Sequence, residues 1–414
     1  MEEWNLSIDQ IHVIVRDNAA NMICGIDLTV AESVGCFIHS LQLVIHDAIF
    51  VQRKIVDIIA KCRKIVSHFS HSSQACTKLK IIQEKLKLPT HKLIQDVVTR
   101  WNSTYYMLSR LYEQKQAVTA YATEHDIPTL DAQQWHLIGN VIIVLKPIEE
   151  ITKIASADDE SIGYVIPSIA TLQSYLSKRT QSQEKDIMIL KEDLKKSIEK
   201  RFLNFSGKNI QESSCFTHAT FLDPRFKTRF LKDEVKVKKL ILDELLAINR
   251  NRSNDEQNIF NSKDKTTDND NAPSFSEILH DAAHESIWQC FDEIANGSKS
   301  DVDSVDTSTE EEKNFNRQPS DRTKKKTIVF TAEIDKYLAM PLITRKEDPV
   351  VWWKTHASEL PNLKILFLKY CSAPPSSVNS ERLFSAAAAV YTEDRNRLLP
   401  DNAEMLIFLM KNMK

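Results

Sequence analysis

The chain has 414 residues, with 54 Lys and Arg, 57 Asp and Glu and a net charge of −3. Only 6 residues are glycine, which predicts a mostly helical protein, and the 7 scattered cysteines exclude a disulfide framework and favour a reducing compartment. Apolar runs are short, and the start lacks a basic stretch followed by an apolar one, so we expect neither a membrane span nor a secretory signal.

The segment 10–17 (QIHVIVRD) is typical of a short buried strand, because a β-branched run ends in an acid, Asp17. After a predicted helix, the segment 34–50 is expected to open as a strand and continue as a helix. Cys36 and His39 form a CxxH pair in this segment. A tetrahedral zinc site needs four ligands, and no second pair is suitably spaced. We therefore interpret Cys36 and His39 as structural residues that position the strand near Asp17.

From residue 51 onward the apolar residues follow a helical period, and we expect Pro147 and Pro167 to bend or interrupt two helices. The stretch 51–100 carries 11 Lys and Arg against 3 Asp and Glu, a local net charge of +8. This charge predicts a surface that meets a polyanion. A solvated helix face is the equally weighted alternative. Further helices are predicted over 91–124, 131–155, 161–178, 184–204 and 234–249.

Residues 251–330 are acidic, with 17 Asp and Glu against 10 Lys and Arg. The part from 251 to 326 is poor in core-forming residues, so we expect a largely disordered linker. Within it, 274–296 has the pattern of an amphipathic helix that docks on the body or on a partner. The basic run DRTKKKT (321–327) is a weak candidate for a nuclear localisation signal.

The last segment, 327–414, is again apolar and aromatic. Ser376 and Ser377 are suitable N-cap residues for a helix that carries Glu381. At about 100° per residue, Glu381 falls on the same side as Phe384 and Ala388, so the pattern predicts a carboxylate that faces a core. Such a carboxylate needs a cation, a metal or a catalytic role. The final helix has a start that resembles a capping box, at Asp401 and Glu404.

Five segments occur in a characteristic order along the chain: RDNAANM (16–22), CFIHSLQLVIHDAI (36–49), VTRWNSTYYMLSRL (98–111), FLDPRFK (221–227) and PPSSVNSERLFSAA through RNRLLP (374–400). Together they resemble the transposases of the hAT superfamily and their domesticated relatives with BED-type zinc fingers. The resemblance spans nearly the whole chain apart from the acidic linker.

The resemblance implies an α/β, helix-dominated fold, namely a truncated ribonuclease-H-like fold interrupted by a large all-α insertion domain. On this basis we expect a ribonuclease-H-like remnant at 1–50, a helical insertion domain at 51–250, the acidic linker at 251–326, and at 327–414 a C-terminal dimerisation region that completes the ribonuclease-H-like core.

In this family an Asp, Asp, Glu triad holds two metal ions, and Mg²⁺ prefers such oxygen ligands. The resemblance implies that Asp17 is the second acid and Glu381 the third. Two alternatives stay open: Asp17 or Asn18 caps the next helix, and Glu381 pairs with Arg395 or Arg397.

The match is incomplete in one important respect. The first acid of the triad is expected on a strand well upstream of Asp17, and Asp9 lies too close to that strand to replace it. The BED finger is also expected to be missing. We therefore expect this chain to be catalytically inactive and to need no cofactor. Mg²⁺ is expected as a cofactor only under the alternative that the protein is an active transposase.

The resemblance also assigns binding residues. Trp101 matches a tryptophan that stacks near an unpaired base, and Arg100, Lys54, Lys61 and Lys64 accompany it as DNA-binding candidates. A helix-packing role for Trp101 is the favoured alternative. Dimerisation candidates in the last helix are Leu406, Leu409 and Met410.

We thus predict a nuclear protein derived from an hAT transposase. It dimerises with itself or with related hAT proteins, has DNA as a further candidate partner, and does not interact with membranes. The alternatives are an active DNA transposase with a longer N-terminus and a non-functional relic that folds poorly because its sheet has an unpaired edge.

Overall fold

The computed structural model describes residues 10–29, 31–178, 185–203, 209–255, 281–297, 321–391 and 398–413. Its helices and strands, in chain order, are β1 (Ile14–Arg16), α1 (Ala20–Asp27), β2 (Ser33–Gly35), α2 (Phe37–Phe50), α3 (Arg53–Ser70), α4 (Ser73–Lys85), α5 (Trp101–Glu113), α6 (Lys115–Ala122), α7 (Ala132–Ile154), the short turn η3 (Ile162–Tyr164), α8 (Val165–Ser177), α9 (Lys185–Ile198), the π-helical turn η4 (Glu199–Leu203), η5 (Ile210–Glu212), α10 (Ser214–Leu222), α11 (Glu234–Asp255), α12 (Asp281–Asn296), α13 (Asp321–Ala339), α14 (Pro349–His356), α15 (Pro361–Tyr370), α16 (Val378–Val390) and α17 (Pro400–Asn412).

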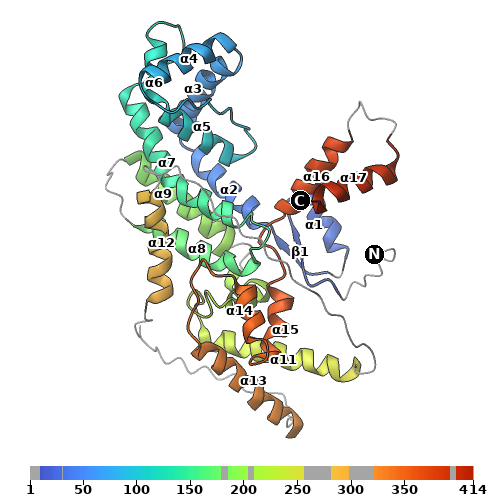
Figure 1. Cartoon of the computed structure of the whole chain (residues 1–414). Coiled ribbons are helices and arrows are strands. Elements are labelled where there is room, and N and C mark those ends of the chain that lie inside the picture. The colour runs from blue at the N-terminus through green and yellow to red at the C-terminus, as the bar shows by residue number, and fades with distance from the viewer. Residues whose placement is uncertain are drawn as a thin grey trace.

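The helix-dominated fold predicted from the sequence is confirmed (Figure 1). Among the described residues the sheet has two strands, and β1 pairs with β2 in parallel with Ile14 opposite Ser33 and Arg16 opposite Gly35. In the same part of the chain, every helix is too short or too polar to span a bilayer.

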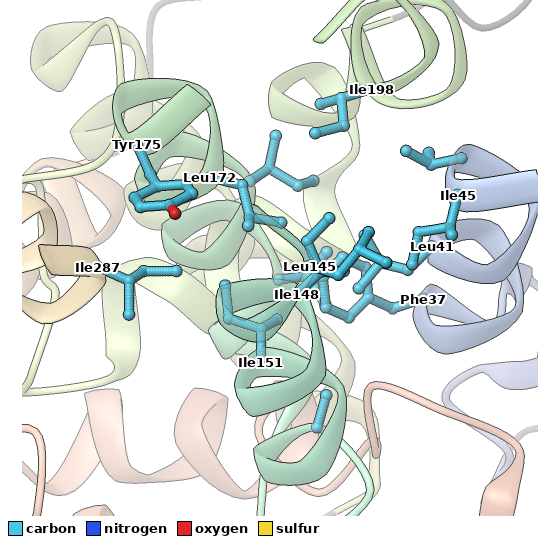
Figure 2. Close-up of a cluster of buried hydrophobic side chains, with 14 of the residues drawn as sticks. Phe37, Leu41, Ile45, Leu145, Ile148, Ile151, Leu172, Tyr175, Ile198 and Ile287 are labelled. Atoms are coloured by element: carbon cyan, nitrogen blue, oxygen red, sulfur yellow. The ribbon is translucent and has the colours of Figure 1, made fainter. Parts of the chain in front are cut away.

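Helix α7 is the centre of the core. Figure 2 shows Leu145, Ile148 and Ile151 of α7 between Phe37 on α2 and Tyr175 on α8, with α12 beyond α8. These side chains are between 0% and 4% exposed. Pro147 was predicted to bend or interrupt a helix, but α7 continues through it. Packing on both sides offsets the hydrogen bond that a proline cannot donate.

The core is continuous across the boundary predicted at residue 50. Helix α2 packs on α9, and one cluster of buried apolar side chains runs from Val34 to Ala373. Helix α12, predicted as an amphipathic segment, docks on α7 and α8, and its buried Phe291 contacts the rings of Phe226 and Phe230. Residues 256–280 and 298–320 of the predicted linker lie outside the described residues, whereas the basic run at 321–327 begins α13.

The predicted helix over 91–124 begins ten residues late, at Trp101. The preceding stretch is fixed by polar side chains of the flanking helices. Gln83 Nε2 donates to the carbonyl of His91 at 3.0 Å, and Arg110 Nη1 donates to that of Lys92 at 2.8 Å. Since side chains satisfy these carbonyl groups, the backbone here does not need a helix to pair them.

Candidate functional site

The candidate site lies at the edge of the sheet where both strands end. Asp17 follows β1 and Cys36 follows β2. Because the strands are parallel, their carboxyl ends share one edge. The backbone N–H of Cys36 donates to the carbonyl of Arg16 at 2.6 Å, which joins the two ends directly.

The Asp17 carboxylate serves the turn that leads into α1. Its Oδ1 accepts a hydrogen bond from the backbone N–H of Ala19 at 3.1 Å, and Ala19 is the N-cap residue of α1. The side chain of Asp17 is half-buried. The acid thus satisfies a backbone donor in the turn before α1, while α1 itself has no side-chain cap hydrogen bond from Asp17 or Asn18.

Cys36 joins the sheet edge to the C-terminal part of the chain. It is the N-cap residue of α2, is 1% exposed, and its Sγ accepts from the backbone N–H of His39 at 3.4 Å and of Ser377 at 3.3 Å. The N–H of Phe37 donates to the carbonyl of Pro375 at 3.0 Å. Cys36 therefore has a structural position, while His39 takes part through its backbone.

Glu381 lies in the first turn of α16 and is exposed, so the expectation that it faces a core is corrected by the structure. Its Oε1 accepts from the hydroxyl of Ser377 at 3.2 Å, and its neighbour Arg382 pairs with Asp158 at 3.1 Å. The reason is that α16 packs mainly on α17, so no sheet face covers the side that carries Glu381. Arg395 and Arg397, the predicted partners, lie outside the described residues.

Hydrogen bonds through Cys36 and Ser377 connect the end of β1 to Glu381, so Asp17 and Glu381 belong to the same edge of the molecule. A two-metal centre needs a larger set of oxygen ligands than two carboxylates. Within the described ranges, no group of three or more His, Cys, Asp or Glu side chains is placed to share a metal ion. These residues do not fit a Mg²⁺ pair, and no cleavage step follows from them.

The α16–α17 hairpin exposes a large apolar surface at the C-terminus. The two helices project from the body beside α1 (Figure 1), and none of their side chains belongs to the main core cluster. The predicted dimerisation residues Leu406, Leu409 and Met410 are 38%, 39% and 58% exposed. The other large apolar side chains exposed on the hairpin and the residues next to it are Leu383, Phe384, Tyr391, Leu399, Met405, Phe408 and Met413.

Helix α17 does not begin with the predicted capping box. Its N-cap residue is Leu399, which makes no side-chain cap, and Pro400 is the first helical residue. Proline is favoured at this position because it lacks the N–H that would otherwise stay unpaired. Ser377 is the N-cap residue of α16, as predicted, although its hydroxyl bonds Glu381 and not a backbone N–H.

The FLDPRFK segment contains a buried ion cluster that sequence reasoning did not assign. Arg225 Nη2 lies 2.7 Å from Asp223 Oδ2 and 2.6 Å from Glu160 Oε1, and all three side chains are at most 8% exposed. Burial raises the pKa of the Glu160 carboxyl, and the guanidinium of Arg225 opposes that shift. The signal in the sequence was a charged Asp-Pro-Arg triplet between apolar residues.

The same segment holds the body and the C-terminal region together. Trp353 Nε1 donates to the carbonyl of Leu222 at 2.9 Å, and the hydroxyl of Tyr337 donates to the carbonyl of Phe221 at 3.0 Å. Lys227, with a φ of 48°, donates to the carbonyl of Tyr337 at 2.7 Å. Helices α13 to α15 are therefore part of the fold, and α16–α17 is the part that projects.

The predicted DNA-binding residues are separated by the structure into exposed and buried groups. Lys64 and Arg100 are exposed, Lys54 pairs with Asp186 at 2.9 Å, and Lys61 donates to Gln134 at 3.4 Å. Trp101 is only 8% exposed and packs beside Tyr105 with ring centroids 6.3 Å apart. In this conformation Trp101 is a helix-packing residue, because a buried indole offers no free face to a base.

Comparison with known proteins covers both parts of the chain. The family model of the ZBED1 RNase-like helical domain matches residues 34–143, and that of the hAT family C-terminal dimerisation region matches residues 333–413. The first match runs from β2 to the first half of α7, and the second includes the C-terminal end of α13 and all of α14 to α17.

Relatives match over nearly the full chain. The chain is 26% identical to human zinc finger BED domain-containing protein 4 over 100% of its own length and 32% of the relative, and 27% identical to human zinc finger BED domain-containing protein 6 over 97% and 40%. It is 25% identical to a Zea mays protein of the AC transposase type over 98% and 49%. The chain thus spans between a third and a half of the length of these relatives. The matched regions and these relatives make the chain similar to hAT-type transposases and to zinc finger BED domain-containing proteins.

Proposed function

We propose that this chain is a transposase-derived protein that acts by self-association, and that the α16–α17 hairpin is the association surface. The observation that carries the proposal is the concentration of exposed apolar side chains on a hairpin inside the matched dimerisation region. The rest of that region contributes side chains to the main core, among them Tyr337, Leu363 and Leu366, which are each 0% exposed.

Water exposure of this hairpin is unfavourable without a partner. Monomeric soluble proteins rarely expose a contiguous apolar patch of more than a few hundred square ångströms. Phe384, Phe408 and Met413 are 72%, 64% and 72% exposed, so a partner surface could remove most of their area from water. At about 25 cal/mol per Å², such burial supplies the main driving force for association.

The test measures the mass of the full chain by light scattering. Replacing Leu406, Leu409 and Met410 together with Gln is expected to convert a dimer into a monomer with an unchanged circular dichroism spectrum. The control replaces Met188 and Ile189, which are 60% and 40% exposed on α9, with Gln. A triple variant that keeps the mass of the wild type would overturn the proposal.

DNA binding is a second candidate function, supported by the charge of +8 in residues 51–100 and by the exposure of Lys64 and Arg100. Association through phosphate contacts depends on salt, with a slope of about −0.9 per neutralised phosphate. Replacing Lys64 or Arg100 with Ala is expected to weaken binding of a DNA duplex and to reduce that slope by about one. A slope unaltered in both variants would refute this assignment.

A ribonuclease-H-like origin is part of the same proposal. It is supported by the matched RNase-like helical domain and by two parallel strands that end at a shared edge with Asp17. We assign no strand cleavage to this chain, so Glu381→Gln is expected to leave association unchanged. Nuclease activity with Mg²⁺ that disappears in Glu381→Gln would instead establish the active-transposase alternative. We also propose that the protein is located in the nucleus, which fluorescence microscopy of the tagged chain would test.

A further inference from the structure

We infer that the exposed basic face of α11 is an internal binding site for an acidic peptide, and that its occupant is the segment 298–320 of the same chain. This face, called the α11 lysine face, is formed by Lys232, Lys236 and Lys239 at the start of the helix. All three residues are exposed. The inference does not depend on the proposed self-association, because it concerns a surface outside the α16–α17 hairpin.

The α11 lysine face is the side of α11 that the neighbouring helices leave uncovered. The helix packs on α10, α13 and α15, and Figure 1 shows it beside α13. The lysine next to the face, Lys238, is different, because it pairs with Glu234 at 3.1 Å and lies 3.9 Å from Asp335 of α13. The three lysines of the face form no ion pair with any residue that the structure describes. The buried side chains, on the opposite side of the helix, are Val237, Ile241 and Leu245.

The segment 298–320 begins and ends beside the two ends of α11. At the first end, Arg229 Nη1 donates to the carbonyl of Gly297 at 3.3 Å, three residues before the α11 lysine face. At the second end, Lys326 Nζ donates to Asn249 Oδ1 at 2.7 Å. The helix between these contacts is about 25 Å long, whereas a segment of this length extends to about 80 Å at most. The segment is therefore long enough to pass along the face.

The charges of the segment and of the face are complementary, and they occur at the same end of α11. Residues 301–312 contain six Asp and Glu and no Lys or Arg, while residues 229–239 contain five Lys and Arg against two Asp and Glu. The acids begin four residues after Gly297, which is the residue held by Arg229. Opposite charges attract at such short range, and a tether of this kind gives them an effective concentration on the order of millimolar.

An exposed apolar side chain on α11 fits the same occupant. Val235 lies next to the α11 lysine face and is 79% exposed. The acidic stretch carries Val302 and Val305 between its acids. A contact between these valines and Val235 removes apolar area from water, so it adds a contribution that salt does not screen.

Other polyanions are less suitable occupants of the face. The segment 256–280 has two lysines among its five acids, and it follows α11 at the end far from the lysines. A DNA duplex would meet the same three lysines. It would have to displace a segment that is already tethered beside them, which lowers its apparent affinity for this face.

The test is cross-linking of the full chain with a water-soluble carbodiimide, followed by mass spectrometry of the peptides. The reagent joins a lysine amine to a contacting carboxylate as an amide, and the carbodiimide takes up the released water and leaves as a urea. The exposed pair Lys336 and Glu359, at 2.9 Å, is the positive control. The exposed Lys85 and Lys87 are the negative control. At low salt we expect roughly tenfold more links from residues 301–312 to the α11 lysine face than to the negative control.

A charge exchange shows whether these charges specify the contact. Replacing the three lysines of the face with Glu is expected to remove its links to the segment, with an unchanged circular dichroism spectrum. Replacing Asp301, Asp303 and Asp306 with Lys in the same chain is expected to restore links, now with the amines on the segment. Links that are not restored, in a chain that keeps the Lys336 to Glu359 link, would contradict a contact specified by charge.

The remaining outcomes identify other occupants and overturn the inference. Equal linking to Lys85 and Lys87 means that the segment has no preferred site, and links from the face to 256–280 identify that segment as the occupant. Links between labelled and unlabelled chains, in a mixture of the two isotopes, identify a second copy. A face without links, whose replacement with Ala lowers the affinity for a DNA duplex, is assigned to DNA.

Discussion

Removal of Arg225 is expected to destabilise the protein strongly, and the reason can be read from its surroundings. Arg225 donates to Asp223 from Nε at 3.0 Å and from Nη2 at 2.7 Å, and to Glu160 from Nη1 at 3.2 Å and from Nη2 at 2.6 Å. The side chain of Asp223 is 1% exposed and that of Glu160 is 8% exposed. Arg225→Ala therefore leaves two buried carboxylates without their shared cation.

Loss of one partner from a buried ion cluster typically costs about 3–5 kcal/mol, because the remaining charge is neither solvated nor paired. We expect a cost of this size for Arg225→Ala in the free energy of unfolding, measured by urea titration with circular dichroism. The cost should shrink as the pH falls. Without the guanidinium, burial of Glu160 raises its pKa in the folded state unopposed, so its protonation favours folding at acidic pH.

Arg382→Ala is the matched control, because Arg382 also pairs with an acid in the segment after α7, Asp158. That pair is 52% and 53% exposed, and exposed pairs contribute about 0–1 kcal/mol. A neutral combination, Arg225→Met with Asp223→Asn and Glu160→Gln, should recover most of the stability. The reasoning is refuted if Arg225→Ala costs no more than Arg382→Ala.

Three further changes test other parts of the structure. Glu333→Ala should cost about 1–3 kcal/mol, because its Oε1 accepts two backbone N–H groups at the start of α15, both at 2.8 Å, whereas the exposed Asp335→Ala should cost far less in the same urea titration. Burial lowers the pKa of His12 to about 4, so its contribution to stability is present above pH 6.5 and is lost as the pH falls from there through 4. His12→Gln should therefore flatten this part of the stability profile, by up to ~2 kcal/mol after allowance for screening. An unchanged profile would contradict the assignment. Gly163→Ala should lower the melting temperature, because a Cβ there would lie 2.7 Å from a backbone carbonyl oxygen of α10. In the control Gly25→Ala the added Cβ meets nothing within 4 Å, so this variant should be neutral or stabilised by about 0.5–1 kcal/mol. Equal effects of the two substitutions would argue against the close approach at Gly163.

The local structure was largely predictable. The β-branched run before Asp17 forms β1, the CxxH segment opens as a strand and continues as α2, and the amphipathic pattern within 274–296 corresponds to the docked helix α12. These predictions succeed because the alternation or helical period of apolar residues reports one buried side of each element. The order of short motifs likewise indicated the family before any packing was known.

What covers a helix was decided only by the tertiary structure. The sequence determined that α16 has an apolar side and that Glu381 lies on it, but the same pattern results whether that side meets a sheet or a partner molecule. In the folded chain α16 packs on α17, so Glu381 is exposed. Trp101 became a buried packing residue, and Arg225 acquired Glu160, 65 residues away, as a partner. Periodicity fixes which side of an element is apolar, whereas long-range packing decides what that side contacts.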